Sequence, residues 1–193
     1  MTWAELLDEI YTLTKRSDLV AETGVALRNA VRMAHKSGKF WRDLAQVTIN
    51  NLALDTVQEV DIPTYLPRLK QVAYIRSTAN NDLQLKEVRI DDLLDEDNYA
   101  RTNVYWGLGT KLKIRAYAAE ASYQVAYWRY PVVSPSTAFD SWIAEDHSDA
   151  LILPAATTVL QMIGENEIRA KLEPLAAQAM RDLIEDNLEM QGR

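Results

Sequence analysis

The spacing of apolar residues changes twice along this chain, and the two changes limit the folds that it can adopt. Residues 3–13 and 18–36 repeat apolar side chains at helical spacing, and helical spacing returns over residues 137–193. The residues between them carry short alternating segments separated by turn signals, which is typical of strands. The sequence therefore predicts an α+β fold, in which a helical bundle from the N- and C-terminal segments carries an inserted antiparallel β-sheet sandwich or barrel.

We expect the 193 residues to form a single domain. Its helical parts are predicted at residues 1–39 and 137–193, and its β-rich insertion at residues 40–136. Because helices from opposite ends of the chain must then pack together, we expect one intimate unit and not two separate ones.

Apolar stripes predict the buried sides of two helices in this bundle. For the helix at residues 18–36, the stripe consists of Val20, Leu27, Val31 and Ala34. For the last helix, it consists of Ile168, Leu172, Leu175, Ala179, Leu183 and Leu188. Pro154 is expected near the start of its helix or at a kink, and Pro174 is expected to bend or restart the last helix.

The stretch YQVAYWRYP, residues 123–131, holds four aromatic side chains. As a strand, it places Tyr123 and Tyr127 on one face and Trp128 and Tyr130 on the other. A sheet with one wet face would alternate more cleanly, so we expect both faces to be covered. Two arrangements fit. Either both faces are buried inside the monomer, or one face packs in the core and a helix, a second sheet or a neighbouring subunit covers the other.

The chain is acidic, with a net charge of −7 and a pI near 4.9, so we expect it to repel nucleic acid more than hold it. It contains no cysteine, which excludes disulfides, thiol catalysis and cysteine-ligated metals. No apolar run approaches the length of a membrane helix, and the first residues do not read as a secretion signal, so no membrane partner is expected.

No catalytic, cofactor-binding or metal-ligating residue is predicted. The two histidines, His35 and His147, lie in no metal motif and are interpreted as surface or helix-end residues. The acidic residues 91–97 lack the spacing of a calcium loop, and Ser141 lies in no nucleophile-elbow motif. Gly-Leu-Gly at residues 107–109 predicts a hairpin turn. A glycosidase-like pair of carboxylates has no required spacing, so that alternative stays open.

Basic residues concentrate on one side of the second predicted helix, at Arg28, Arg32, Lys36 and Lys39. Over residues 15–42 the chain has seven Lys or Arg and two acidic residues. One interpretation is a wet helix face whose positive end suits the helix dipole. The other is a contact with an acidic protein partner, a neighbouring copy of the chain or DNA.

Two extended segments carry a resemblance to a known family. The first, residues 3–44, is a helix pair that ends in an aromatic-Arg-Asp run at the start of a strand. The second, residues 127–167, is an aromatic strand that ends in Pro and is followed by a Ser-Trp-Ile turn and an Ala-rich helix closed by Gly-Glu. In these features the chain resembles the head-to-tail adaptor (neck, or connector) proteins of tailed bacteriophages, especially the short-tailed ones.

The resemblance implies a non-enzymatic structural protein of the virion neck, made in the host bacterial cytoplasm. Such adaptors form a ring, typically of a dozen copies, beneath the portal. The ring extends the DNA channel and gives the tail its attachment surface. The implied partners are the portal protein, neighbouring adaptor subunits and tail nozzle or tail fibre proteins, while genomic DNA passes through without specific binding. No cofactor is expected.

In several relatives the C-terminal helix or tail docks against the portal. The docking residues implied here are Leu183, Ile184, Leu188, Met190 and Arg193. The residues implied for contacts with neighbouring subunits or partners are Arg28, Arg32, Lys36, Lys39, Tyr123, Tyr127, Trp128 and Tyr130. In such a ring the basic helix would meet acidic groups of a neighbour or the portal, such as those at residues 91–97 or 185–189.

Two alternatives from other functional classes stay open. A phage-encoded peptidoglycan hydrolase would need a cleft with two carboxylates, one of them with a raised pKa. A soluble non-enzymatic binding module would need a concave pocket with convergent polar groups.

Overall fold

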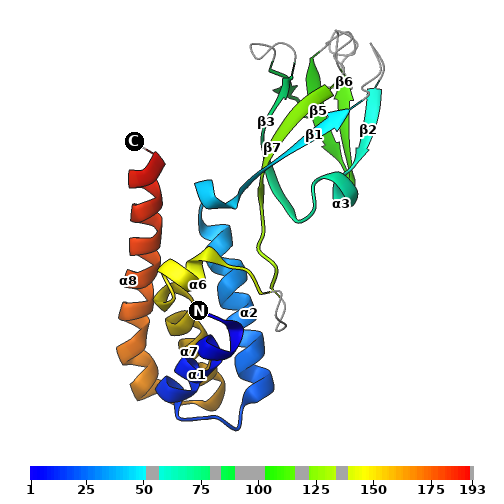
Figure 1. Ribbon diagram of the computed structural model, residues 1–193. Helices are drawn as coiled ribbons and strands as arrows, with labels where there is room; N and C mark the ends of the chain where they lie inside the picture. The colour runs from blue at the N-terminus through cyan, green and yellow to red at the C-terminus, as the bar shows by residue number, and fades with distance from the viewer. Residues whose placement is uncertain (51–56, 79–83, 90–102, 116–121, 134–138, 192–193) are drawn as a thin grey trace. The chain divides into compact units, whose positions relative to one another are not determined.

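The chain folds into two compact units, seen in a computed structural model that describes residues 1–50, 57–78, 84–89, 103–115, 122–133 and 139–191. The helical unit comprises Met1–Arg42 and Tyr130–Arg193, and the β unit comprises Asp43–Arg129. The predicted α+β class is confirmed, because helices and sheets both form and occupy separate parts of the chain (Figure 1). The predicted insertion, residues 40–136, extends past both ends of the β unit. The single-domain interpretation stays a prediction, and the acidic segment 91–97 lies outside the described residues.

Five helices form the described part of the helical unit. They are α1 (Trp3–Thr14), α2 (Val20–Ser37), the short α6 (Trp142–Asp146), α7 (Asp149–Ile163) and α8 (Asn166–Gln191). α7 is the central helix, and α1, α2 and α8 all pack against it. This explains why α7 is apolar nearly all round: Leu151, Ala155 and Val159 are fully buried.

The start of α1 is fixed by its sequence. Thr2 caps the helix, and its hydroxyl accepts the backbone N–H of Glu5 while the Glu5 carboxylate accepts the backbone N–H of Thr2 at 2.7 Å. Because these hydrogen bonds favour the charged form, they lower the pKa of the Glu5 carboxyl. The ammonium group of Met1 also donates a hydrogen bond to the carbonyl of Ala144, at 3.2 Å, which ties this end of α1 to α6.

The stripes predicted for α2 and α8 are partly wrong. On α2, Leu27, Val31 and Ala34 are buried, but Val20 is exposed because it begins the helix at the rim of the core. On α8, Leu183 is fully buried. The buried side of that helix passes through Ala176 and Ala179 and leaves Leu175 and Leu188 exposed.

Both internal prolines lie within continuous helices. Pro154 is the sixth residue of α7, and the hydroxyls of Thr157 and Thr158 both donate to its carbonyl oxygen, at 2.9 and 2.8 Å. α8 passes through Pro174 as one helix of 26 residues, so the expected restart does not occur. Helices tolerate such prolines when packing on neighbouring elements outweighs the lost backbone hydrogen bond.

The β unit contains two open sheets around a shared core. One has the order β1 (Leu44–Asn50), β7 (Ser122–Arg129), β3 (Leu69–Ser77), and both of its pairings are antiparallel. The other has the order β2 (Val57–Asp61), β6 (Lys111–Arg115), β5 (Val104–Leu108), β4 (Lys86–Glu87). A short 3₁₀ helix, Trp41–Asp43, precedes β1, and the single-turn α3, Ile62–Tyr65, follows β2. Since the sheets are open, the barrel alternative is wrong for the described strands. The pairing of β4 with β5 is parallel and departs from the antiparallel prediction.

The Gly-Leu-Gly segment forms the predicted hairpin. It lies where β5 turns into β6, and the two strands pair antiparallel from Leu108 and Lys111 outward. Gly109 has a φ of 59°, which glycine adopts without steric cost.

The two faces of β7 lie in different environments. Tyr123, Val125 and Tyr127 are buried in the core between the sheets, together with residues of β1, β3, β5 and β6. On the other face Ala126 is buried and Trp128 is half-buried. The inward face therefore packs inside the monomer.

Candidate interaction site

The α2 stripe is a row of basic side chains, Arg28, Arg32 and Lys36, on the solvent side of α2. It forms because Leu27 and Val31 turn toward the core and occupy the opposite side of the helix. Arg32 and Lys36 are exposed, and Arg28 is half-buried. None of the ion pairs among the described residues includes any of the three basic residues. The described part of the chain thus leaves this positive charge unneutralised.

Lys39, predicted as the fourth member of the stripe, lies beyond the end of α2 at Ser37 and is exposed. The backbone changes direction at Gly38, which has extended dihedral angles. Lys39 is therefore not held on the helix face that carries the other three basic residues.

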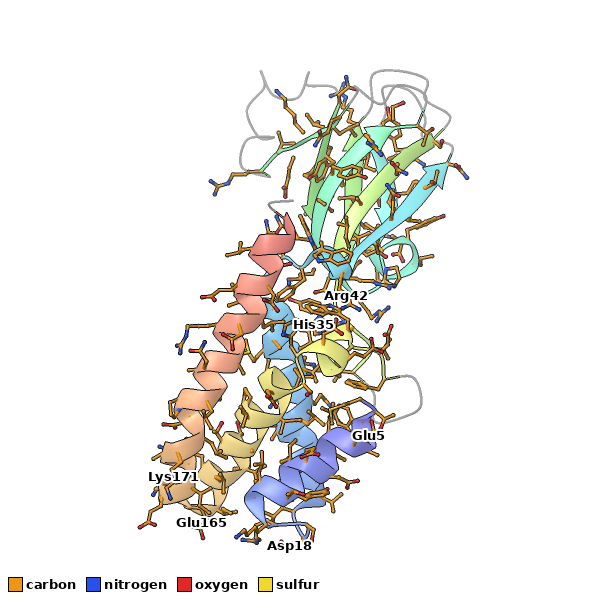
Figure 2. All side chains as sticks on the ribbon, turned by 60° about the vertical axis from the view of Figure 1, so that its left-hand side comes forward. Glu5, Asp18, His35, Arg42, Glu165 and Lys171 are labelled. Atoms are coloured by element: carbon orange, nitrogen blue, oxygen red, sulfur yellow. The ribbon has the colours of Figure 1, made fainter. Side chains whose placement is uncertain are left out.

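A cluster of rings and charges closes one end of the helical unit around Trp142. The Trp142 ring contacts Phe40, His35 and His147 edge-on, with centroid separations of 5.2, 6.0 and 6.1 Å. Arg42 lies over the same indole, with its guanidinium carbon 5.0 Å from the ring centroid. Figure 2 shows His35 and Arg42 at this end of the unit. We call these five residues the Trp142 cluster.

Acidic residues of α6 complete the cluster. Arg42 forms an ion pair with Asp146, and its other terminal nitrogen lies 4.0 Å from a carboxylate oxygen of Glu145. The guanidinium group therefore joins the segment after α2 to α6 through charge and through the indole face at the same time. This geometry favours a structural role for Arg42.

His35, a member of the Trp142 cluster, forms a buried pair with Ser141. The His35 Nε2 atom lies 2.9 Å from the Ser141 Oγ atom, although the two residues are 106 positions apart. His35 is 1% exposed and Ser141 is 6% exposed. The interpretation of His35 as a surface residue is wrong, although it does lie in the last turn of α2. A serine paired with histidine can act as a nucleophile only where a substrate reaches the oxygen, and here both side chains are packed inside the unit.

Two polar contacts hold the C-terminal half of α8 at the same end of the helical unit. The Nε2 atom of His147 lies 3.5 Å from a carboxylate oxygen of Asp186. The backbone N–H of Trp41 donates to the Oδ1 atom of Asn187, at 3.4 Å. The second contact places the exposed Trp41 beside the last described turns of α8.

The residues implied for portal docking fall into different environments. Leu183 is fully buried in the helical core, so its side chain is not on a surface. Ile184 is half-buried and Leu188 is 59% exposed, and their spacing of four residues places them on one side of α8. The side chain of Met190 and the whole of Arg193 lie outside the described residues.

The aromatic candidates Tyr123, Tyr127 and Trp128 of β7, and Tyr130 just after it, are also divided. Tyr123 is completely buried and Tyr127 is 4% exposed, so both are core residues of the β unit and not surface contacts. Trp128 and Tyr130 are half-buried. On the outward face of the β1-β7-β3 sheet the structure adds an unpredicted network. There Gln46 donates to the hydroxyl of Tyr74, at 2.9 Å, and Arg76 lies 5.0 Å from the centroid of the Tyr74 ring.

Two ion pairs of the β unit lie across neighbouring strands. In the β2–β6 register Glu59 faces Lys113 and Asp61 faces Lys111, and both form ion pairs, the second at 3.0 Å. The hydrogen bond from Lys113 lowers the pKa of the Glu59 carboxyl. The Asp61 pKa is lowered by the hydroxyl of Thr64 and then by Lys111. The two ion pairs thus neutralise these four charges within the β unit.

The structure exposes several apolar residues that the sequence analysis did not select as contact candidates. They are Val25 and Met33 on α2, Trp41, and Leu175 on α8, with exposed fractions of 46–63%. The sequence does predict exposure of Val25 and Met33, because both lie off the apolar stripe of their helix and among its basic residues.

Two other kinds of feature were sought among the described residues: metal sites and membrane-spanning helices. No group of three or more His, Cys, Asp or Glu side chains that could hold a metal ion occurs among the residues that the structure describes. Within the same ranges, no helix has both the length and the hydropathy to span a membrane. The sequence matches no known family profile and no curated protein.

Proposed function

We propose that this chain is a structural protein of a tailed bacteriophage, a head-to-tail adaptor that forms a ring beneath the portal and joins the capsid to the tail. The observation that carries the proposal is an exposed apolar patch at one end of the helical unit. We call it the docking patch, and it consists of Trp41, Ile184 and Leu188. Exposed tryptophan and leucine side chains on joined segments are typical of protein–protein contact sites.

The docking patch joins segments from the two parts of the helical unit. Trp41 follows α2, whereas Ile184 and Leu188 belong to the last turns of α8, and the hydrogen bond from the Trp41 backbone N–H to Asn187 joins the two segments. Leu183, on the inner side of α8, anchors this half of the helix in the core. A patch on anchored helical turns is preorganised for binding, which lowers the entropic cost of docking to the portal.

Capture by the cognate portal tests the proposal. Leu188→Glu places a charge in the docking patch while leaving the core untouched, so we expect it to abolish capture of the chain on immobilised portal. Met162→Glu is the matched control, because Met162 is 56% exposed on α7 and lies outside the patch. It should bind as the unchanged chain does.

Mass measurement of the captured complex completes the test. The proposal requires several copies of the chain on each portal. Failure of the unchanged chain to bind the portal would overturn the adaptor function. Equal binding by Leu188→Glu and the unchanged chain would leave the adaptor function standing and show that the docking patch is assigned wrongly.

A further inference from the structure

The α2 face extends the basic stripe by one apolar residue. Val25, Arg28, Arg32 and Lys36 follow at intervals of three, four and four residues, so they lie along one side of α2. Val25 is 46% exposed although it is apolar, and the residues that follow it on this side are basic. A helix side that combines uncompensated positive charge with an exposed valine suits an acidic and partly apolar partner.

The α8 face has the opposite character. Leu175, Gln178, Asp182 and Glu185 follow at intervals of three, four and three residues along one side of α8. Leu175 is 54% exposed, and the other three are exposed as well. Gln178 donates to the Asp182 carboxylate, at 2.5 Å, which orients that acid on the helix surface, and its amide oxygen accepts from the Arg181 guanidinium at 2.6 Å.

The two faces belong to helices on opposite flanks of the helical unit. α2 and α8 each pack against α7, and Figure 1 shows them on either side of it. The hydrogen bond from Trp41 to Asn187 joins the C-terminal ends of the two helices, so they run in the same direction and end at a similar level. A rotation about an axis parallel to both helices therefore brings the α2 face of one copy beside the α8 face of the next copy, with the helices parallel.

We propose that the α2 face of one subunit packs against the α8 face of the neighbouring subunit, in a repeated head-to-tail contact. Arg32 and Lys36 then lie opposite Asp182 and Glu185 of the neighbour, and Val25 covers the exposed Leu175. A contact between two unlike surfaces generates a ring when the rotation closes. The inference rests on the proposed adaptor function, for which it names the subunit interface.

Charge decides between this contact and a twofold one. Because the two faces lie on opposite flanks, a twofold contact cannot pair them both ways at once. It would place an α2 face against another α2 face, or an α8 face against another α8 face, and would bring like charges together. Only the mixed pairing places basic groups opposite acidic groups. For this reason the occupant of the α2 face is a second copy of this chain.

Chemical cross-linking tests the geometry without the portal. The chain contains no cysteine, so introduced thiols are the only reactive ones. Asn29→Cys lies beside the α2 face and Leu175→Cys lies in the α8 face, and neither change removes a charge. With a short bismaleimide at high protein concentration, the double variant should give a ladder of trimers and larger species. Each single variant should give dimers at most. Absence of species above the dimer in the double variant would overturn the proposal.

Charge reversal in this cysteine background tests the pairing. Chains with Arg32→Glu and Lys36→Glu should lose the ladder, and so should chains with Asp182→Lys and Glu185→Lys. An equal mixture of the two should regain it, because each reversed face then meets the other reversed face. Reversal of two charges on α1, Asp8→Lys with Glu9→Lys, is the matched control and should leave the ladder unchanged. Failure of the mixture to recover would refute the contact between these two faces.

The result is separable from the portal experiment. A ladder formed by a chain that never binds the portal would support this contact and overturn the adaptor function. Binding of the portal by a chain that gives no ladder there or in solution would overturn this contact and leave the adaptor function standing.

Discussion

The helical unit and the β unit treat their charged side chains differently. On the β unit, Lys111 and Lys113 each face a carboxylate on the neighbouring strand, and the pKa values of those carboxyls are lowered. On the helical unit, Arg32 and Lys36 point to solvent, and no ion pair of the described residues includes them. The β2–β6 face is neutralised by ion pairs across its strands, whereas the α2 stripe keeps its positive charge without an ion pair among the described residues. The α2 stripe is therefore the charged surface on which the proposed subunit contact rests.

The largest effect is expected from a substitution in the core of the helical unit. Leu183→Ala removes a fully buried side chain from α8, and we expect it to lower the free energy of unfolding by about 3 kcal/mol. Leu188→Ala, on the exposed side of the same helix, should change it by less than about 0.5 kcal/mol. Urea unfolding followed by far-ultraviolet circular dichroism measures both. Equal losses in the two variants would show that α8 does not pack in this orientation.

A smaller effect is expected at the end of the helical unit. Ser141→Ala leaves the buried His35 ring without the contact that the serine hydroxyl makes at 2.9 Å. We expect a loss of about 1–2 kcal/mol in unfolding free energy, because a buried polar contact is removed. Thermal unfolding with Ser148→Ala as the control, a half-buried serine without a side-chain cap hydrogen bond, checks the result. No difference between the two serines would argue against a structural His35–Ser141 pair.

The β unit contains a buried titratable residue, Tyr105. Burial, followed by the nearby Glu87, raises the pKa of the Tyr105 phenol to about 12. Because the folded pKa lies above the ordinary value of 10.0, the unfolded state ionises first. This stabilising contribution is therefore complete below pH 10 and is lost as the pH rises toward 12. Ultraviolet titration should show a late tyrosine that is missing in Tyr105→Phe. A titration in which Tyr105→Phe loses an early step would contradict this assignment.

The smallest effect is expected where a paired surface charge, Lys113, is compared with an exposed charge on α2, Arg32. The Glu59 pKa is held below its ordinary value of 4.5, so the ion pair with Lys113 stabilises the fold above that pH. The contribution is lost as the pH falls through the lowered pKa. Lys113→Gln should therefore make stability less dependent on pH between about pH 5 and pH 3. Arg32→Gln should leave the curve unchanged, since no described carboxylate pairs with Arg32. A changed curve for Arg32→Gln would reveal a partner within the chain.

The sequence predicted the elements whose signals are local. The Gly-Leu-Gly hairpin depends only on neighbouring residues, so it could be recognised. The buried side of α8 was predicted partly wrong because Leu175 and Leu188 were preferred over Ala176. Small residues are buried where two helices approach closely, and only the packing partner reveals that.

The candidate site was less predictable because its contacts are long-range. Burial of His35 depends on Ser141, which is 106 residues away, and on rings that arrive from the second half of the chain. The basic residues of α2 were found, since helical spacing alone aligns them. Their acidic counterpart on the outer side of α8 was recognised only as a charged stretch, because the sequence does not say which side of α8 faces α7.

The division of the helical unit between Met1–Arg42 and Tyr130–Arg193 sets an order of events during synthesis. The β unit is a continuous segment, so all of its strands are available once Arg129 has left the ribosome. α1 and α2 emerge first but must wait for α7, the helix against which they pack. Their apolar sides therefore stay uncovered throughout translation of the β unit, which makes the nascent helix pair a natural client for chaperones.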